Sequence, residues 1–163
     1  MNLRTLSHVW VLSATILLSS PGLFAESSAV SVLGSLQGHG TGVVQGAGIL
    51  QHAVSCEGTA SQIGRFTLLM HETVNLGALT GTGVFLLSFP NGDVIFGTVA
   101  GNGEPPIAHL AHIVEHLHIL GGTGRFQGAS GDLTIDSFSD DSTIPFYDAI
   151  SGLLSGTINT PGK

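Results

Sequence analysis

The side chains that best suit acid–base chemistry in this sequence are those of two glutamates, Glu72 and Glu115. Glu115 lies in an apolar segment, residues 107–120. On a strand it shares one face with Ile113 and Leu117, because alternate side chains of a strand point to the same side. Burial on such a face raises the pKa of a carboxyl group and suits it to proton transfer. We therefore take Glu115 as the first candidate for a catalytic acid and Glu72 as the second.

Histidines of the same segment could bind a metal ion. The sequence His112-Ile113-Val114-Glu115-His116 matches the H-x-x-E-H pattern of inverted zinc proteases, but that chemistry needs a helix with both histidines on one face. On a strand these two histidines are ~13 Å apart and cannot share one metal. His116 and His118 are roughly 7 Å apart on one strand face and could bind a metal if another strand supplied a ligand. Exposed, hydrogen-bonded histidines are the more frequent outcome, so we expect no metal and no other cofactor.

Other sequence patterns give no support to several classes of enzyme. The nucleophile pattern G-x-S-x-G is absent, as are the nucleotide-binding patterns G-x-G-x-x-G and G-x-x-x-x-G-K-[ST]. A group of aspartates lacks the spacing of a calcium-binding loop, and we interpret its members as solvated loop acids. These aspartates are Asp132, Asp136, Asp140, Asp141 and Asp148.

Residues 1–25 have the parts of a secretory signal peptide in the expected order. A basic start with Arg4 precedes an apolar run over residues 9–18, Pro21-Gly22 ends the run, and Ala25 supplies a small residue before the cleavage point. The run is shorter than the ~20 residues that span a bilayer. We therefore expect cleavage after Ala25, export to the periplasm or the outside of the cell, and no membrane insertion of the mature protein. Residues 26–163 then form a single domain.

The charge of residues 26–163 limits the partners of the protein. They contain three basic residues, Arg65, Arg125 and Lys163, and eleven acidic ones. The whole chain has a formal net charge of −7. So few cations cannot neutralise many phosphates, and we expect neither nucleic acid nor an anionic membrane surface as a partner. Arg65 or Arg125 could instead pair with Glu115 and remove it from chemistry. Cys56 is the single cysteine, so we expect a small buried side chain without a disulfide.

Short stretches of alternating apolar and polar residues, separated by glycine clusters, run through this domain. The whole sequence contains 24 glycines without a collagen period. In one stretch, Gly81, Gly83 and Phe85 fall on the same face. Asn91-Gly92 predicts a type I′ hairpin turn, in which both residues have positive φ. Seven or eight strands at this spacing predict a closed antiparallel barrel or a sandwich, and closure suits the glycine content because glycine permits bends that curl a sheet.

Residues 107–120 fit two kinds of secondary structure. Leu110 and Leu117 fall at helical spacing, and the segment begins after Pro106 and ends before Gly121. As a strand, the same segment alternates between an apolar face that includes Glu115 and a face of histidines. The periodicity leaves this choice open.

The glycine-rich stretch after this segment favours the strand. The run Gly121-Gly122-Thr123-Gly124-Arg125-Phe126 resembles a hallmark of the allene oxide cyclase-like and dirigent-like barrel superfamily, in which a strand enters such a turn. Ile63-Gly64-Arg65-Phe66-Thr67 and Asn91-Gly92-Asp93 resemble two further elements of small exported bacterial proteins with this pattern. The resemblance implies an all-β chain folded as one eight-stranded antiparallel barrel, often trimeric in plant members. It also implies a structural turn at Gly121, Gly122 and Gly124, which Arg125 pins through backbone carbonyls.

Two functional classes follow from these observations. A barrel of about eight strands can hold one small ligand, so we expect a protein that binds an apolar small molecule without catalysis, or has a structural role. The alternative is a cyclase, isomerase or dirigent-like protein that orients a hydrophobic substrate inside the barrel, where Glu115 or Glu72 assists proton transfer. The scarcity of ionisable residues favours binding over catalysis. Apolar outward-facing strands also suit a homodimer or homotrimer.

Overall fold

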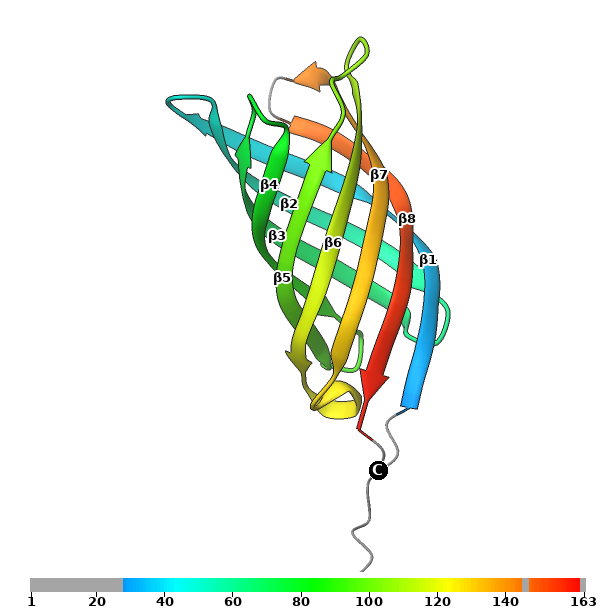
Figure 1. Cartoon of the computed structure of the whole chain (residues 1–163). Helices are drawn as coiled ribbons and strands as arrows, with labels where there is room; N and C mark the ends of the chain where they lie inside the picture. Colours follow the sequence, from blue (N-terminus) through cyan, green and yellow to red (C-terminus); the bar gives the residue numbers. More distant parts are fainter. Residues whose placement is uncertain (1–27, 145–146, 162–163) are drawn as a thin grey trace, which may run out of the picture.

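The computed structural model describes residues 28–144 and 147–161, so the predicted leader, residues 1–25, lies outside the described residues. The strands form one closed barrel, in which each strand pairs antiparallel with the next and β8 pairs with β1 (Figure 1). They are β1 (Ser28–Gln45), β2 (Ile49–Ala60), β3 (Gly64–Asn75), β4 (Thr80–Ser88), β5 (Val94–Gly103), β6 (Leu110–Gly122), β7 (Ser130–Ile144) and β8 (Tyr147–Thr160). The predicted eight-stranded antiparallel barrel is confirmed, and the sandwich alternative is wrong.

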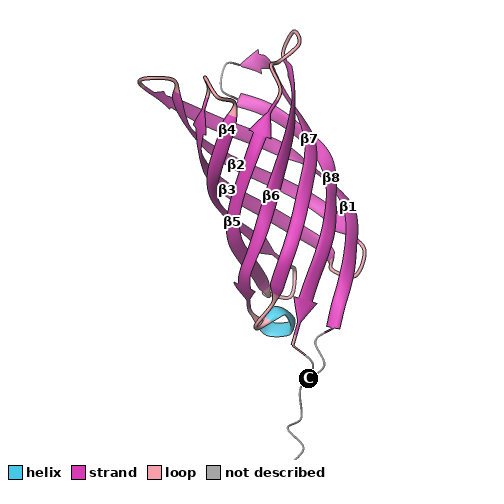
Figure 2. Ribbon diagram, viewed as in Figure 1, coloured by secondary structure: helices cyan, strands magenta, loops and turns pink. Residues whose placement is uncertain are grey.

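The segment that also fits a helix forms a strand. In β6, Glu115 and Leu117 face the barrel interior, whereas His116 and His118 are exposed on the outer wall. One turn of 3₁₀ helix, η1 (Gly124–Phe126), is the helical element of the described residues (Figure 2). No helix in this part of the chain has the length and apolar character needed to cross a bilayer.

The two ends of the barrel differ. The β1–β2, β3–β4 and β5–β6 connections lie at the upper end in Figure 1, and the β2–β3, β4–β5 and β6–β7 connections lie at the lower end. We call the upper end the open end, because a cavity opens there. The lower end is the closed end, because buried side chains fill it.

Two phenylalanines and one arginine plug the closed end. Phe89 and Phe126 are buried, with their ring centroids 4.7 Å apart. The Arg125 guanidinium lies 5.1 Å from the Phe89 ring centroid and 4.6 Å from that of Phe126. It also donates a hydrogen bond of 2.6 Å to the Ile63 carbonyl. Arg125 therefore joins the β2–β3, β4–β5 and β6–β7 connections.

Apolar side chains fill the barrel between this plug and the cavity. Alternation sends every second residue of each strand inward. The fully buried inward side chains include Leu68, Leu87, Ile95, Leu117, Ile119, Leu133, Ile135, Leu154 and Ile158. Burying one such side chain contributes about 1.5–3 kcal/mol to stability.

The Asn91-Gly92 turn differs from the sequence-based prediction. Of these two residues Gly92 alone has positive φ, at 85°, and its amide donates to the Phe89 carbonyl. The strands close where the Phe89 amide donates to the Asp93 carbonyl, which makes a three-residue loop. The predicted type I′ turn is wrong, because it would pair Pro90 with Asp93 and proline has no amide hydrogen to donate.

The glycine run after β6 is divided between strand and turn. Gly121 and Gly122 are the last residues of the strand, and a Cβ on Gly121 would lie 2.9 Å from the Phe96 ring. Gly124 has a positive φ of 56°, a conformation that favours glycine, and it begins η1 next to Arg125.

Candidate functional site

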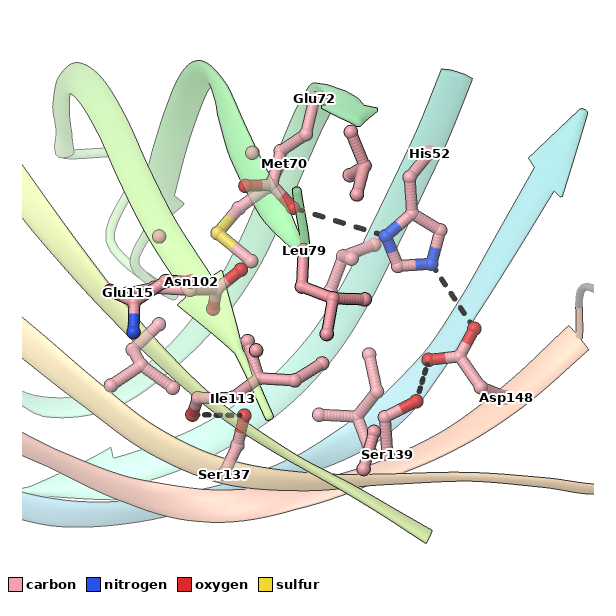
Figure 3. Close-up of a pocket in the computed structure, with 18 of the residues that line it drawn as sticks. His52, Met70, Glu72, Leu79, Asn102, Ile113, Glu115, Ser137, Ser139 and Asp148 are labelled. Atoms are coloured by element: carbon pink, nitrogen blue, oxygen red, sulfur yellow. Dashed lines mark hydrogen bonds and ion pairs between the residues drawn. The ribbon is translucent and has the colours of Figure 1, made fainter. Parts of the chain in front are cut away.

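A cavity of about 260 Å³ opens at the open end of the barrel (Figure 3). Its wall is mainly apolar and includes Leu36, Leu50, Val54, Leu68, Met70, Val74, Ile113, Ile135 and Ile150. The volume exceeds the ~150 Å³ that suffices to hold benzene in an apolar protein cavity. The cavity therefore has room for a small ring-containing ligand.

Among the acids and histidines that line this cavity, four are buried or nearly buried and come from four different strands, whereas Glu104, His109 and Asp141 are exposed. The four are His52 on β2, Glu72 on β3, Glu115 on β6 and Asp148 on β8. Each occupies an inward position among apolar neighbours of its own strand. The three acids among these four are buried, and the His52 side chain is 12% exposed.

His52 links two of the acids. Its Nε2 lies 3.1 Å from Asp148 Oδ1, and its Nδ1 lies 3.9 Å from Glu72 Oε2. Ser139 Oγ donates a 2.7 Å hydrogen bond to Oδ2 of Asp148. These four side chains form a connected polar row across the cavity (Figure 3).

The pKa of His52 is raised to about 9. Burial by itself lowers this pKa, but hydrogen bonds to Asp148 and Glu72, together with the charges of both acids, outweigh it. Burial pushes the pKa of Asp148 upward, yet its hydrogen bonds with His52 and Ser139 hold it below the ordinary value. At neutral pH, His52 is therefore a cation paired with the Asp148 carboxylate.

Glu115 keeps its proton near neutral pH. Burial raises its pKa to about 8, and the negative charge of Glu72 and a hydrogen bond with that side chain act in the same direction. The positive charge of His52 opposes this shift in part. At pH 7 the Glu115 carboxyl group is mostly protonated, so it can donate a hydrogen bond or a proton inside an apolar cavity.

Glycines give the two glutamates the room they need. Strands β4 and β5 separate Glu72 from Glu115 on the barrel wall, with Gly83 opposite Glu72 and Gly101 opposite Glu115. A Cβ on Gly101 would lie 2.9 Å from Glu115 Cγ, and one on Gly81 would lie 3.5 Å from Glu72 Oε1. Small residues on β4 and β5 therefore leave room for each carboxyl group at the cavity wall.

No protein-family model matches the chain, and no curated protein matches it. Among solved structures, it is similar to the pterocarpan synthase dirigent protein GePTS1, with a TM-score of 0.55 and 14% sequence identity. The match covers 91% of this chain and 98% of that protein. The chain has a dirigent-like fold. The resemblance seen in the glycine motifs is thus confirmed for the architecture, which is all that this level of identity establishes.

The dirigent-like barrel brings both predicted acids, Glu72 and Glu115, into one cavity. It places the predicted metal ligands elsewhere, because His116 and His118 lie on the outer wall, where His118 Nδ1 is 2.8 Å from Asp132 Oδ1. Over residues 28–144 and 147–161, no three His, Cys, Asp or Glu side chains gather as a metal site requires.

The two arginines that could pair with Glu115 lie away from it. Arg125 is at the closed end, with its Nε 3.7 Å from Asp93 Oδ2. Arg65 is exposed at the start of β3, near the same end. Glu115 is therefore available to the cavity rather than held in an ion pair with either arginine.

Sequence reasoning missed His52, Asp148 and Ser139 as site residues. The interpretation of Asp148 as a solvated loop acid is wrong, because its side chain is buried on the inner face of β8. Alternation was the available signal: His52 shares its face with Leu50, and Asp148 shares its face with Ile150. A polar residue at an inward position of an apolar strand is a candidate site residue in such a barrel.

Proposed function

We propose that the protein binds an apolar small molecule in the barrel cavity and holds one hydrogen-bond acceptor of that molecule against Glu115. The observation that carries the proposal is a buried carboxyl group, with its pKa raised to about 8 by burial, on the wall of an open and largely apolar cavity. A ligand with a carbonyl or ether oxygen can accept a hydrogen bond from this carboxyl group.

The charges around the cavity favour a neutral ligand. His52 is already balanced by Asp148, at 3.1 Å, so it is not free to bind an anion. Glu72 adds negative charge next to Glu115. An anionic ligand would therefore meet repulsion in a site of low dielectric constant, where the cost is high.

A matched pair of ligands tests this proposal. Acetonaphthone and ethylnaphthalene have nearly the same apolar skeleton, but only the ketone carries an acceptor. We expect the ketone to bind about tenfold more tightly at pH 6, because a buried hydrogen bond is worth about 1.4 kcal/mol. The preference should decline as pH rises through about 8, the pKa of Glu115. Displacement of fluorescent phenylnaphthylamine measures both affinities.

Two variants of Glu115 separate its hydrogen bond from its charge. Glu115→Gln keeps a donor and loses the titration, so the preference for the ketone should persist at pH 9. Glu115→Met removes the donor, so the two ligands should bind equally at every pH. Equal affinities in the unmodified protein at pH 6, or no binding of either ligand, would refute the proposal.

One observation favours a second function, that of an isomerase or cyclase. Glu115 and Glu72 pair a proton donor with a proton acceptor inside one cavity, which suits adding a proton at one atom of a substrate and removing another. Exchange of the methyl hydrogens of acetonaphthone with heavy water, followed by NMR, tests this chemistry. Exchange that the protein accelerates and that Glu115→Gln abolishes, with ketone binding retained, supports catalysis. Ketone binding without hydrogen exchange would support the binding function and refute catalysis of this kind.

Export is part of the same proposal, and it rests on the sequence of residues 1–25. Mass spectrometry of the protein from the exported fraction of its host should find a chain that begins at Glu26. The native mass of that fraction also reports whether the barrel assembles as a dimer or trimer. A chain that begins at Met1 and stays in the cytosol would remove export from the proposal.

A further inference from the structure

The open end of the barrel carries exposed apolar side chains around the cavity mouth. Ile107, on the β5–β6 connection, is 83% exposed, and Val43, near the end of β1, is 65% exposed. Val44, Leu76 and Leu110 are also exposed. We call these five residues the apolar rim. Exposed apolar side chains that gather at one end of a protein mark a contact surface.

Backbone hydrogen bonds join the connections that carry the apolar rim. The Leu76 amide donates a 2.8 Å hydrogen bond to the Gly48 carbonyl, which links the β3–β4 and β1–β2 connections. The Gly103 amide donates another of 2.8 Å to the Leu79 carbonyl, which links β5 to the β3–β4 connection. Leu76, Leu79 and Pro106 also line the cavity. The apolar rim therefore meets the cavity wall at Leu76.

The apolar rim is uncharged where the first two of these connections meet. Residues 40–51 and 73–92 contain no acidic or basic side chain. The exposed acids of the open end lie on the β5–β6 connection and on β7, and two of them have histidine neighbours. Glu104 lies 3.4 Å from His112, and Asp141 lies 3.1 Å from His109. No arginine or lysine of the described residues lies at this end, so an anionic surface has nothing to attract it.

We propose that the apolar rim docks on a bilayer of zwitterionic lipid, where the cavity exchanges its ligand with the hydrocarbon. The exchange rests on the proposed ligand binding, whereas the docking does not. Apolar side chains at loop tips can enter the headgroup and acyl boundary to a depth of about 5–10 Å. A neutral headgroup layer suits an uncharged rim, whereas an anionic layer repels a chain with a net charge of −7. An apolar ligand then reaches the cavity without crossing water.

Sedimentation with phosphatidylcholine vesicles tests the docking. The test variant is Val43→Asp, and the matched control is Leu33→Asp. Leu33 is on the same strand as Val43 and is also 65% exposed, but it lies toward the closed end. We expect the unmodified protein and the control to bind the vesicles, and the test variant to bind at least about tenfold more weakly. Adding phosphatidylserine should weaken binding.

Three results would overturn the docking: no sedimentation of the unmodified protein, equal loss in the Leu33→Asp control, or binding that requires phosphatidylserine. A change of oligomeric mass in the test variant without lipid would assign the apolar rim to a second copy of the chain and also overturn it. Displacement of phenylnaphthylamine by acetonaphthone, in buffer without vesicles, tests the cavity independently. Vesicle binding without ketone binding would refute only the proposed function. Ketone binding without vesicle binding would refute only the docking.

Discussion

His52 and Asp148 are 96 residues apart in the sequence, yet His52 Nε2 lies 3.1 Å from Asp148 Oδ1 inside the barrel. Strand β1 runs between the two strands that carry them, and its residue opposite Asp148 is Gly40. A Cβ at position 40 would lie 2.6 Å from Asp148 Oδ1 and closer still to His52 Nε2. The missing side chain of Gly40 therefore lets the cation and the carboxylate meet across an intervening strand.

Replacing Gly40 with alanine should disrupt this ion pair. The added methyl group displaces both side-chain ends, because neither can stay at its present position. We expect the free energy of unfolding to fall by about 1.5–3 kcal/mol, the usual value of a hydrogen bond between charged groups. The pKa of His52 should fall from about 9 toward its ordinary value. Urea unfolding and NMR titration of the His52 ring measure these two effects.

Gly103→Ala is the matched control for this substitution. Gly103 also lines the cavity, but the nearest atom to a Cβ there would be 3.7 Å away, an ordinary contact. The control should leave the pKa of His52 unchanged. Equal effects of Gly40→Ala and Gly103→Ala on that pKa would contradict the role given to Gly40.

The protein should be more stable at pH 5 than at pH 9. In the folded state the pKa of Glu115 is raised from 4.5 to about 8 and that of His52 from 6.5 to about 9. Between each ordinary value and the raised one, the folded protein holds more protons than the unfolded chain. The free energy of unfolding therefore falls as pH rises, from pH 4.5 to 8 through Glu115 and from pH 6.5 to 9 through His52. Each group contributes a slope of up to about 1.4 kcal/mol per pH unit.

Glu115→Gln isolates one of these two groups. A glutamine side chain does not titrate, so the slope between pH 4.5 and 6.5, where His52 does not yet contribute, should become flat. Urea midpoints at each pH provide the measurement. A free energy of unfolding that increases from pH 5 to pH 9 in the unmodified protein would show that neither pKa is raised.

The sequence predicted the barrel because much of its geometry is local. Alternation correctly places Gly81, Gly83 and Phe85 on one face, and the glycine-rich turns mark where strands end. Periodicity did not decide the secondary structure of residues 107–120, since Leu110 and Leu117 fit a helix, whereas Ile113, Leu117 and Ile119 fit one face of a strand. Pairing with β5 and β7 on either side settles it, and that information is not in the segment itself.

The site was predictable only in part, because some of its residues are far apart in the sequence and meet only in the folded barrel. Glu115 and Glu72 are recognisable because each interrupts an apolar face of its own strand. The contact between His52 and Asp148 forms only when β1 pairs with β8, because this pairing brings together strands from the two ends of the chain. The register of that pairing, and the glycine that it places between the two side chains, require the folded barrel.

Replacing Arg125 with methionine should destabilise the closed end. The substitution removes the hydrogen bond to the Ile63 carbonyl and the contacts of the guanidinium with Phe89 and Phe126. We expect a loss of about 1–2 kcal/mol in the free energy of unfolding, and only partial recovery in Arg125→Lys, which lacks the planar fork. Arg65→Met, at an exposed position of β3, should change it by less than about 0.5 kcal/mol. Equal losses in the two methionine variants, measured by urea unfolding, would show that Arg125 is merely a surface charge.

Cys56 should resist alkylation in the folded protein. Burial raises its pKa to about 12, and the charges of Glu115 and Asp148 act in the same direction. The thiolate is the reactive form, and at pH 8 it then amounts to about one molecule in ten thousand, against about a quarter for a free cysteine. Iodoacetamide at pH 8 should therefore modify the urea-unfolded chain rapidly and the folded protein only at its rate of unfolding. Because Cys56 lines the cavity, any reaction of the folded protein should slow further when acetonaphthone is bound. Modification of the folded protein at the rate of a free cysteine would mean that water and the reagent reach the cavity wall, and that the wall is not the low-dielectric surface on which the raised pKa of Glu115 depends.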